Sequence, residues 1–223
     1  MNLQTFLSHS DKITGIAWAV IVTLLVMSIV SIGIILERAW VYRRTRRQSQ
    51  ACALEASRLL RSGRLREAQE VTGRDNVRDS HLARVLAVGL REWEGQWEDG
   101  ETAMRLDTVR TAVRHAIDES VGDLRRGLVV LGTIASTAPF VGLFGTTFGI
   151  INAFSAISST KTSDFAAISG GISEALVTTA FGLFVAIPAL WAYNGLGGRV
   201  DRIASELDRA GDQLLLFLNR RGQ

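Results

Sequence analysis

One charged residue, Glu174, interrupts an apolar stretch in which a carboxyl group is costly. It is the only Asp, Glu, Lys or Arg between Phe165 and Leu196. A carboxylate in hydrocarbon rarely faces lipid, and acids in such segments commonly mark an ion path. Glu174 could instead be a protonated, hydrogen-bonded structural acid. We favour a proton-handling or pore-lining carboxyl, because acids inside membrane spans are functional by default.

Three threonine hydroxyls could act together with this carboxyl. Thr178 lies one turn after Glu174 and within about 40° of it on a helical wheel, whereas Thr179 points elsewhere. Thr146 lies in an earlier apolar stretch, beside a face of glycines. Its hydroxyl could bond back to its own helix or face a pore, and the residues alone leave both alternatives open.

A face of glycines indicates where two helices approach each other closely. Gly142, Gly145 and Gly149 fall within about 60° of one another on the same wheel. Small residues spaced in this way allow helices in lipid to come into close contact, so we predict a helix-packing face here. Two prolines, Pro139 and Pro188, are predicted to bend their helices, with the freed carbonyls answered by neighbouring groups.

The uncharged runs are long enough to cross a membrane. The chain has 223 residues, of which 47% are hydrophobic and gathered in blocks, as is typical of an integral membrane protein. At about 1.5 Å per residue, each run can span a hydrocarbon core roughly 30 Å thick. The sequence therefore predicts an all-α integral membrane protein with three transmembrane helices, at residues 13–36, 127–157 and 165–196.

Arginines determine the predicted topology. They follow the first span closely, as Arg38, Arg43, Arg44, Arg46 and Arg47. The positive-inside rule places this flank in the cytoplasm, so the N-terminus is expected outside and the C-terminus inside. The remaining segments are then a periplasmic N-terminal segment, a cytoplasmic helical domain, a periplasmic turn and a cytoplasmic C-terminal helix, at residues 1–12, 37–126, 158–164 and 197–223.

The two segments assigned to the cytoplasm have helical spacing. A long helix is predicted from about residue 101 into the second span, with shorter helices before it near 48–62, 64–72 and 80–95. The long helix carries one apolar stripe from Leu106 to Leu128. The C-terminal segment carries a heptad seam from Val200 to Phe217, which is predicted to lie against that stripe.

No pattern of an enzyme or a cofactor site accompanies these features. The chain has no GxxxxGK[ST] loop, no Ser-His-Asp set and no Cys/His cluster, so we predict no catalytic residue, no metal and no cofactor. The net charge of +3 is small and is explained by topology rather than by nucleic acid. Three helices with one acid do not make a convincing solitary channel. We therefore expect a ring of subunits with a partner in the middle.

Two stretches carry a resemblance to a known family. They read APFVGLFGTTFGIINAF at 138–154 and GGISEALVTTAFGLFVAIPALWAYN at 170–194. In these stretches the sequence resembles the ExbB/TolQ/MotA family of proton-channel motor subunits, and it is most similar to the ExbB/TolQ branch. The order of the segments and the basic flank after the first span agree with this resemblance, whereas residues 48–100 carry little signature.

The resemblance implies a protein of the bacterial inner membrane that works as a pentamer. Its ring would enclose two single-span helices of an ExbD/TolR-type partner that supplies an essential aspartate, and proton flow would drive a TonB/TolA-like or motility output protein. The pore residues would be Thr146, Glu174 and Thr179, while the wheel places Thr178 beside Glu174. Family members often have Val-Trp where this chain has Thr147 and Phe148. A gliding-motility stator and a non-conducting membrane scaffold are the alternatives.

Overall fold

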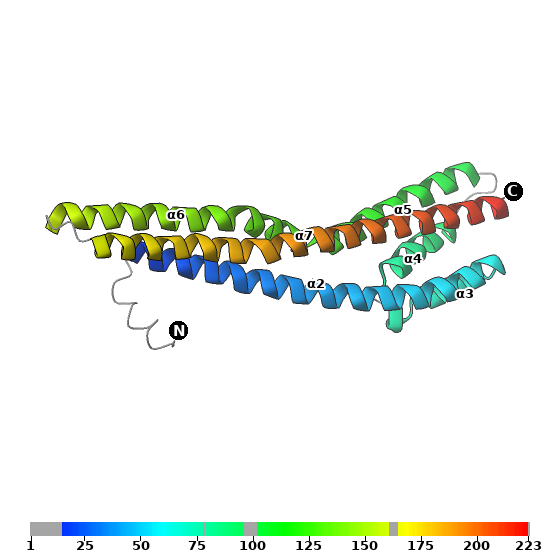
Figure 1. Cartoon of the computed structure of the whole chain (residues 1–223). Helices are drawn as coiled ribbons and strands as arrows, with labels where there is room; N and C mark the ends of the chain where they lie inside the picture. The colour runs from blue at the N-terminus through cyan, green and yellow to red at the C-terminus, as the bar shows by residue number, and fades with distance from the viewer. Residues whose placement is uncertain (1–14, 78, 96–101, 161–164, 223) are drawn as a thin grey trace. The chain divides into compact units, whose positions relative to one another are not determined.

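The computed structural model describes residues 15–77, 79–95, 102–160 and 165–222 (Figure 1). These residues are helical almost throughout, and no strand occurs among them. The predicted N-terminal segment, 1–12, and most of the predicted turn, 158–164, lie outside the described residues. The elements in chain order are α2 (Gly15–Arg61), α3 (Leu65–Thr72), the short 3-10 helix η2 (Asp75–Val77), α4 (His81–Trp93), α5 (Thr102–Arg125), α6 (Leu128–Thr160) and α7 (Phe165–Gly222).

Three of these helices, α2, α6 and α7, are long and apolar enough to cross a membrane. This confirms the predicted all-helical fold for the described residues, with three candidate membrane-spanning helices. The physical reason is that hydrocarbon offers no hydrogen bonds to the main chain. A helix satisfies its backbone groups within its own segment, so an uncharged run of this length forms one.

Two of the spanning helices continue well beyond their apolar segments. α2 runs through the arginine-rich flank to Arg61, and α7 runs from Phe165 to Gly222. The tail that the sequence analysis treats as a further helix is therefore the end of α7. Gly197 and Gly198 do not interrupt it, because a glycine inside a helix costs only about 1 kcal/mol relative to alanine.

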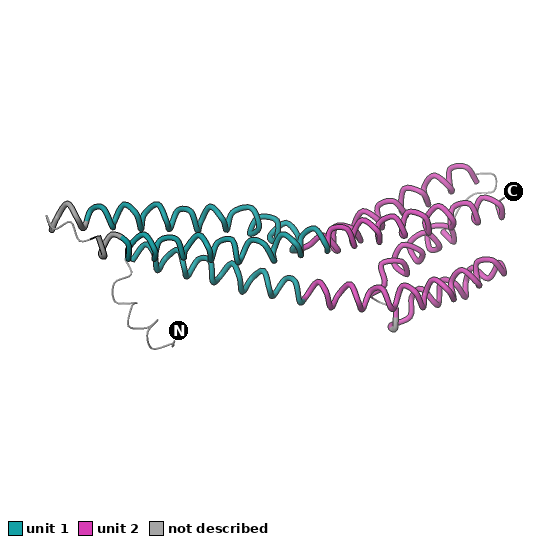
Figure 2. Tube along the Cα trace, in the orientation of Figure 1, with its two compact units in different colours: residues 1–36, 127–195 teal, residues 37–126, 196–223 magenta. Residues whose placement is uncertain are grey.

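The chain divides into two compact units (Figure 2). Unit 1 comprises residues 1–36 and 127–195, and unit 2 comprises residues 37–126 and 196–223. In unit 1, Val20 and Leu24 of α2 join an apolar cluster with buried residues of α6 and α7. Ala138 and Ala189 in this cluster are fully buried. Their small side chains allow the main chains of the three helices to lie close together.

The core of unit 2 confirms that the C-terminal seam packs on the stripe of α5. The core includes Val109, Val113 and Ile117 of α5 together with Leu207, Leu214 and Leu218 of α7. Gly211 faces α5 so closely that a Cβ on it would lie 2.9 Å from Val113. A Cβ on Gly89 of α4 would lie 2.8 Å from the same valine. Val113 therefore fills the space left by one glycine on each neighbouring helix.

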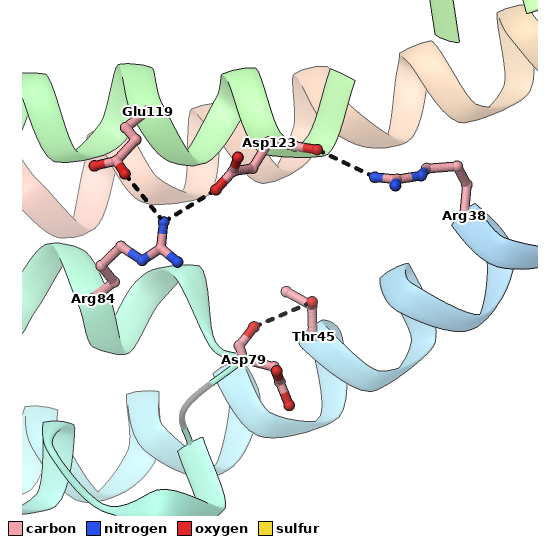
Figure 3. Close-up of polar contacts among 6 residues, drawn as sticks. All are labelled: Arg38, Thr45, Asp79, Arg84, Glu119 and Asp123. Carbon is pink, nitrogen blue, oxygen red and sulfur yellow. Dashed lines mark hydrogen bonds and ion pairs between the residues drawn. The ribbon is translucent and has the colours of Figure 1, made fainter. Parts of the chain in front are cut away.

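The helix that was predicted to run unbroken into the second span ends at Arg125. Gly127 has a φ of 77°, which is left-handed and interrupts the helix between α5 and α6. The last carbonyls of α5 accept hydrogen bonds from α2: the Tyr42 hydroxyl donates to Leu124 at 2.6 Å, and Arg38 donates to Asp123 at 3.2 Å (Figure 3). The prediction failed because these capping donors lie far away in sequence.

The left-handed turn at Gly127 generates a test. Gly127→Ala is expected to destabilise the protein by about 1–2 kcal/mol, because a Cβ clashes in this conformation. Thermal denaturation in detergent, followed by circular dichroism, measures the effect. Gly198→Ala is the matched control, since a Cβ there meets nothing within 4 Å. The control should be neutral or slightly stabilising. Equal losses in both variants would contradict the role of Gly127.

Cys52 provides a second test, because it is the only cysteine and is 1% exposed. Burial, helped by the nearby Glu55 carboxylate, raises the pKa of Cys52 to about 11. Its thiolate fraction near pH 8 is then reduced by about a hundredfold relative to an ordinary thiol. Iodoacetamide should label the folded protein at least about that much more slowly than the denatured chain. Equal labelling rates would show that α2 is not packed in unit 2 as described.

Candidate functional site

The glycines of α6 lie where this helix meets α7 at backbone distance. A Cβ on Gly142 would lie 2.7 Å from the carbonyl oxygen of Thr178. From the other side, a Cβ on Gly182 would lie 2.7 Å from the carbonyl oxygen of Ala138. Real Cβ atoms do not approach backbone this closely, so only glycine fits at either position without moving a helix.

The close contact extends along both helices in antiparallel order. Built Cβ atoms would lie 2.6 Å from the Thr178 hydroxyl oxygen at Gly145 and 2.7 Å from the Ala175 Cβ at Gly149. Further along, one on Gly171 would lie 2.8 Å from the Ala153 Cβ. The sequence analysis identified only the α6 side of this stripe. The spacing of Gly171, Ala175, Thr178 and Gly182 at three and four residues was the signal for the α7 side.

Thr178 is part of this contact between the helices. Its side chain is 2% exposed, and its hydroxyl lies 2.8 Å from the Ala175 carbonyl of its own helix and 3.1 Å from the Gly142 carbonyl of α6. One hydroxyl hydrogen serves these two acceptors, so Thr178 forms a polar tie across an otherwise apolar contact. Within one protomer its hydroxyl is directed at α6.

The hydroxyls of Thr146 and Thr179 differ in whether they have a hydrogen-bond partner. Thr146 is 6% exposed and donates to the Leu143 carbonyl of its own helix at 2.8 Å, which is the first of the two alternatives left open by the sequence. The Thr179 hydroxyl oxygen is buried and has no partner among the described residues. A buried hydroxyl without a partner is costly in an apolar setting. The hydroxyl of Thr179 is therefore an unsatisfied polar group in this part of the chain.

Glu174 lies at the edge of the α6–α7 contact. Its neighbour Ala175 faces Gly149, and its own side chain is half-buried. With none of the described residues does its carboxyl group form a hydrogen bond or an ion pair. Positions 174 and 179 fall about 70° to either side of the centre of the contact face of α7, by the geometry of 3.6 residues per turn. The structure thus places Glu174 and Thr179 on opposite edges of that face.

Large apolar side chains cover much of the outside of unit 1. Exposed examples are Trp18, Leu25, Ile29, Phe140, Phe144, Leu176, Phe181, Phe184 and Trp191. In a protein that spans a membrane, such side chains contact lipid or another protein. Pro139 and Pro188 lie inside the continuous helices α6 and α7, where neighbouring helices allow a proline to be tolerated. The predicted bends stay predictions.

A metal site formed by the residues that the structure describes would need several ligands close together. Within these residues no three His, Cys, Asp or Glu side chains are grouped as a metal would require. The candidate site in unit 1 therefore consists of one carboxyl group, three hydroxyls and a backbone contact of small residues. Such a set can relay protons or hold a partner helix, because it combines a titratable group with donors and acceptors in an apolar setting.

Comparison with known proteins relates the chain to a family. Residues 77–209 match the profile of the MotA/TolQ/ExbB proton channel family. The chain is 34% identical over 220 residues to the Tol-Pal system protein TolQ of Haemophilus influenzae, covering 96% of this chain and 94% of that protein. It is 32% identical to the biopolymer transport protein ExbB of Neisseria meningitidis over 99% of each chain.

A third relative is matched over part of its length. The biopolymer transport protein ExbB of Pseudomonas putida is 38% identical over 172 residues, which cover 74% of this chain and 50% of that protein. The chain therefore spans about half the length of this relative but nearly all of the Haemophilus and Neisseria proteins.

The backbone contact between α6 and α7 makes a direct prediction. Gly142→Ala should lower the stability of the protein by about 1–3 kcal/mol, because the added Cβ forces apart two main chains that cannot repack like side chains. The thermal unfolding midpoint in detergent should fall by about 2–4 °C for each kcal/mol. Gly195→Ala on α7 is the control, since a Cβ there meets nothing within 4 Å. An unchanged midpoint for Gly142→Ala would rule out the contact.

Proposed function

The chain belongs to the MotA/TolQ/ExbB proton channel family, and we propose that it is a ring subunit of a proton-driven motor in a bacterial inner membrane. In this proposal, protons move down their electrochemical gradient through a pore formed by several copies of the chain. Each proton releases about 2.3 kcal/mol per 100 mV of membrane potential. That free energy is converted into mechanical work in the cell envelope.

Glu174 is the observation that carries the proposal. It is the one charged residue in the apolar part of α7, it is half-buried, and its carboxyl has no partner within the described part of the protomer. An acid in a membrane span requires water, a proton or a partner group. Because the described part of the protomer supplies no partner group, we propose that Glu174 finds one in a pore shared with other chains.

The threonines take different roles in this proposal. Thr146 and Thr179 are proposed to line the pathway with Glu174, as the family resemblance implies. The unpartnered hydroxyl of Thr179 supports this role, and the oxygen of Thr146 can still accept a hydrogen bond after donating to Leu143. Thr178 is proposed to hold α6 against α7, because its hydroxyl is occupied by that contact.

The remaining features support a ring with a central partner. The exposed apolar side chains of unit 1 offer surface to neighbouring subunits, and the carboxyl of Glu174 has no partner among the described residues. We propose a homopentamer around two single-span helices of an ExbD/TolR-type protein. The arginine bias supports a periplasmic N-terminal segment, with residues 37–126 and 197–223 in the cytoplasm.

Some relatives that match this chain are named ExbB and others TolQ. The proposal for the protein that the motor energises is therefore limited to what these two names share. The motor would energise an envelope protein of the TonB or TolA type, for biopolymer transport or for a Tol-Pal system. A gliding-motility stator is the alternative within the same class. A scaffold that holds a partner helix without conducting protons is the alternative from another class.

The proposed pathway is tested with Glu174→Gln and Thr146→Ala, each co-expressed with an ExbD/TolR-type partner and reconstituted in liposomes. Proton uptake driven by a potassium diffusion potential should fall more than about tenfold in Glu174→Gln, equivalent to ~1.4 kcal/mol of barrier. Thr146→Ala should fall in the same direction. Glu206→Gln, which removes an exposed acid of unit 2, is the matched control.

Co-purification with the partner separates loss of assembly from loss of conduction. Variants that assemble normally and still conduct at the full rate would exclude Glu174 and Thr146 from the pathway. Variants that stop conducting but still support the envelope output in cells would favour the scaffold.

A further inference from the structure

A cavity in unit 2 is lined by charged side chains that the proposed function does not use. Its volume is about 270 Å³, and it lies where α2, the start of α4 and the end of α5 meet. The start of α4 contributes Ser80 and His81 to its lining, and the end of α5 contributes Asp123. The titratable residues of its lining are Arg38, Asp79, His81, Arg84, Asp123 and Arg126.

The two acids of the cavity already have basic partners. Asp123 lies 3.1 Å from Arg84, which also reaches Glu119 at 3.8 Å, as Figure 3 shows. Asp79 lies 2.6 Å from Arg44, outside the lining. Because each carboxylate is neutralised by an arginine, the acids do not make this cavity a cation site.

Three side chains of the lining have nitrogens without a hydrogen-bond partner among the described residues. The Nε of Arg38 is buried without a partner, in a side chain that is only 12% exposed, although its two other nitrogens are bonded. The Nδ1 of His81 is also buried without a partner. The guanidinium of Arg126 forms no ion pair or hydrogen bond with the described residues. Buried donors normally have partners, so the nitrogens of Arg38 and His81 point to a missing acceptor. Arg126 is exposed, and its guanidinium is accessible to such an acceptor.

The protonation state of His81 allows its Nδ1 to act as a hydrogen-bond donor. Burial and the nearby Arg84 lower the pKa of His81, while Asp123 and Asp79 act weakly in the opposite direction. The imidazole is therefore neutral at pH 7, and one of its two nitrogens carries a hydrogen. An anion in the cavity would select the tautomer in which Nδ1 donates.

We propose that this cavity binds a phosphate group through Arg38, Arg126 and His81. A phosphate oxygen can accept from each of the three side chains at once, and arginine is the preferred partner of phosphate because its planar fork matches the oxygens. Arg38 and Arg84 have acidic partners in Glu37 and Asp123, so Arg126 contributes the positive charge that a phosphate would balance.

The position of the site in the sequence indicates two sources for the phosphate. Arg38 follows the apolar segment that ends at Leu36, and Arg126 precedes the one that begins at Leu128. Residues at the borders of membrane spans lie near phospholipid headgroups. The ligand is therefore a phosphodiester headgroup of an anionic lipid or a free phosphate from solution.

Two probes applied to the full-length, delipidated protein in a non-ionic detergent distinguish these sources. Inorganic phosphate is titrated by calorimetry. Phosphatidylglycerol is added against phosphatidylcholine, and retained lipid is counted by native mass spectrometry. We expect one saturable site per chain for at least one probe. Retention of phosphatidylglycerol alone identifies a headgroup site, and binding of inorganic phosphate identifies a free-phosphate site.

Variants then assign the binding to this cavity. Arg126→Gln should weaken it at least about tenfold, while Arg126→Lys retains most of it. Arg126 makes no side-chain contact that the fold needs, so loss of folding is not expected, and circular dichroism checks this. Arg47→Gln, at an exposed arginine of α2 outside the lining, is the control. Absence of saturable binding for both probes, or equal losses in Arg126→Gln and Arg47→Gln, would overturn the proposal.

Discussion

The meeting of two main chains between α6 and α7 is the constraint on which the rest of unit 1 depends. Lipid offers no hydrophobic drive that would press apolar helices together, so association relies on close packing and polar ties. Gly142 and Gly182 supply the close packing, and Thr178 supplies the tie. Once these three positions are fixed, the rotation of α7 is fixed too. Glu174 and Thr179 are then held at the two edges of the contact.

Unit 2 is stabilised by a different physical effect. Water is available there, so apolar burial drives packing, and a core of valines and leucines joins α4, α5 and α7. Polar groups gather at its edge, where α5 ends and α4 begins. The two units thus share α2 and α7 in sequence but are stabilised by separate physical effects.

Much of this fold follows from the sequence alone, and the reasons are local. Absence of charge over more than twenty residues predicts a spanning helix, and steps of three and four residues predict that the C-terminal seam packs on the stripe of α5. The continuity of α7 through Gly197 and the break at Gly127 did not follow from local signals. The end of α5 depends on neighbours that a helical wheel does not contain, such as Tyr42, which lies 82 positions before Leu124.

The candidate site shows the same division. A wheel correctly relates Thr178 to Glu174 by angle, yet it does not say which helix occupies the face between them. That face belongs to α6, so Thr178 is buried in the protomer while Glu174 remains at its edge. The roles of Thr146, Glu174 and Thr179 stay predictions, because the proposed pore would be formed by several chains.

The caps on α5 have a consequence for the order in which the chain acquires its structure. Their donors, Arg38 and Tyr42, belong to α2, and their acceptors, the carbonyls of Asp123 and Leu124, are made about eighty residues later. Synthesis proceeds from the N-terminus, so α2 is complete before α5 leaves the ribosome. The last carbonyls of α5 thus meet donors on a helix that has already been synthesised.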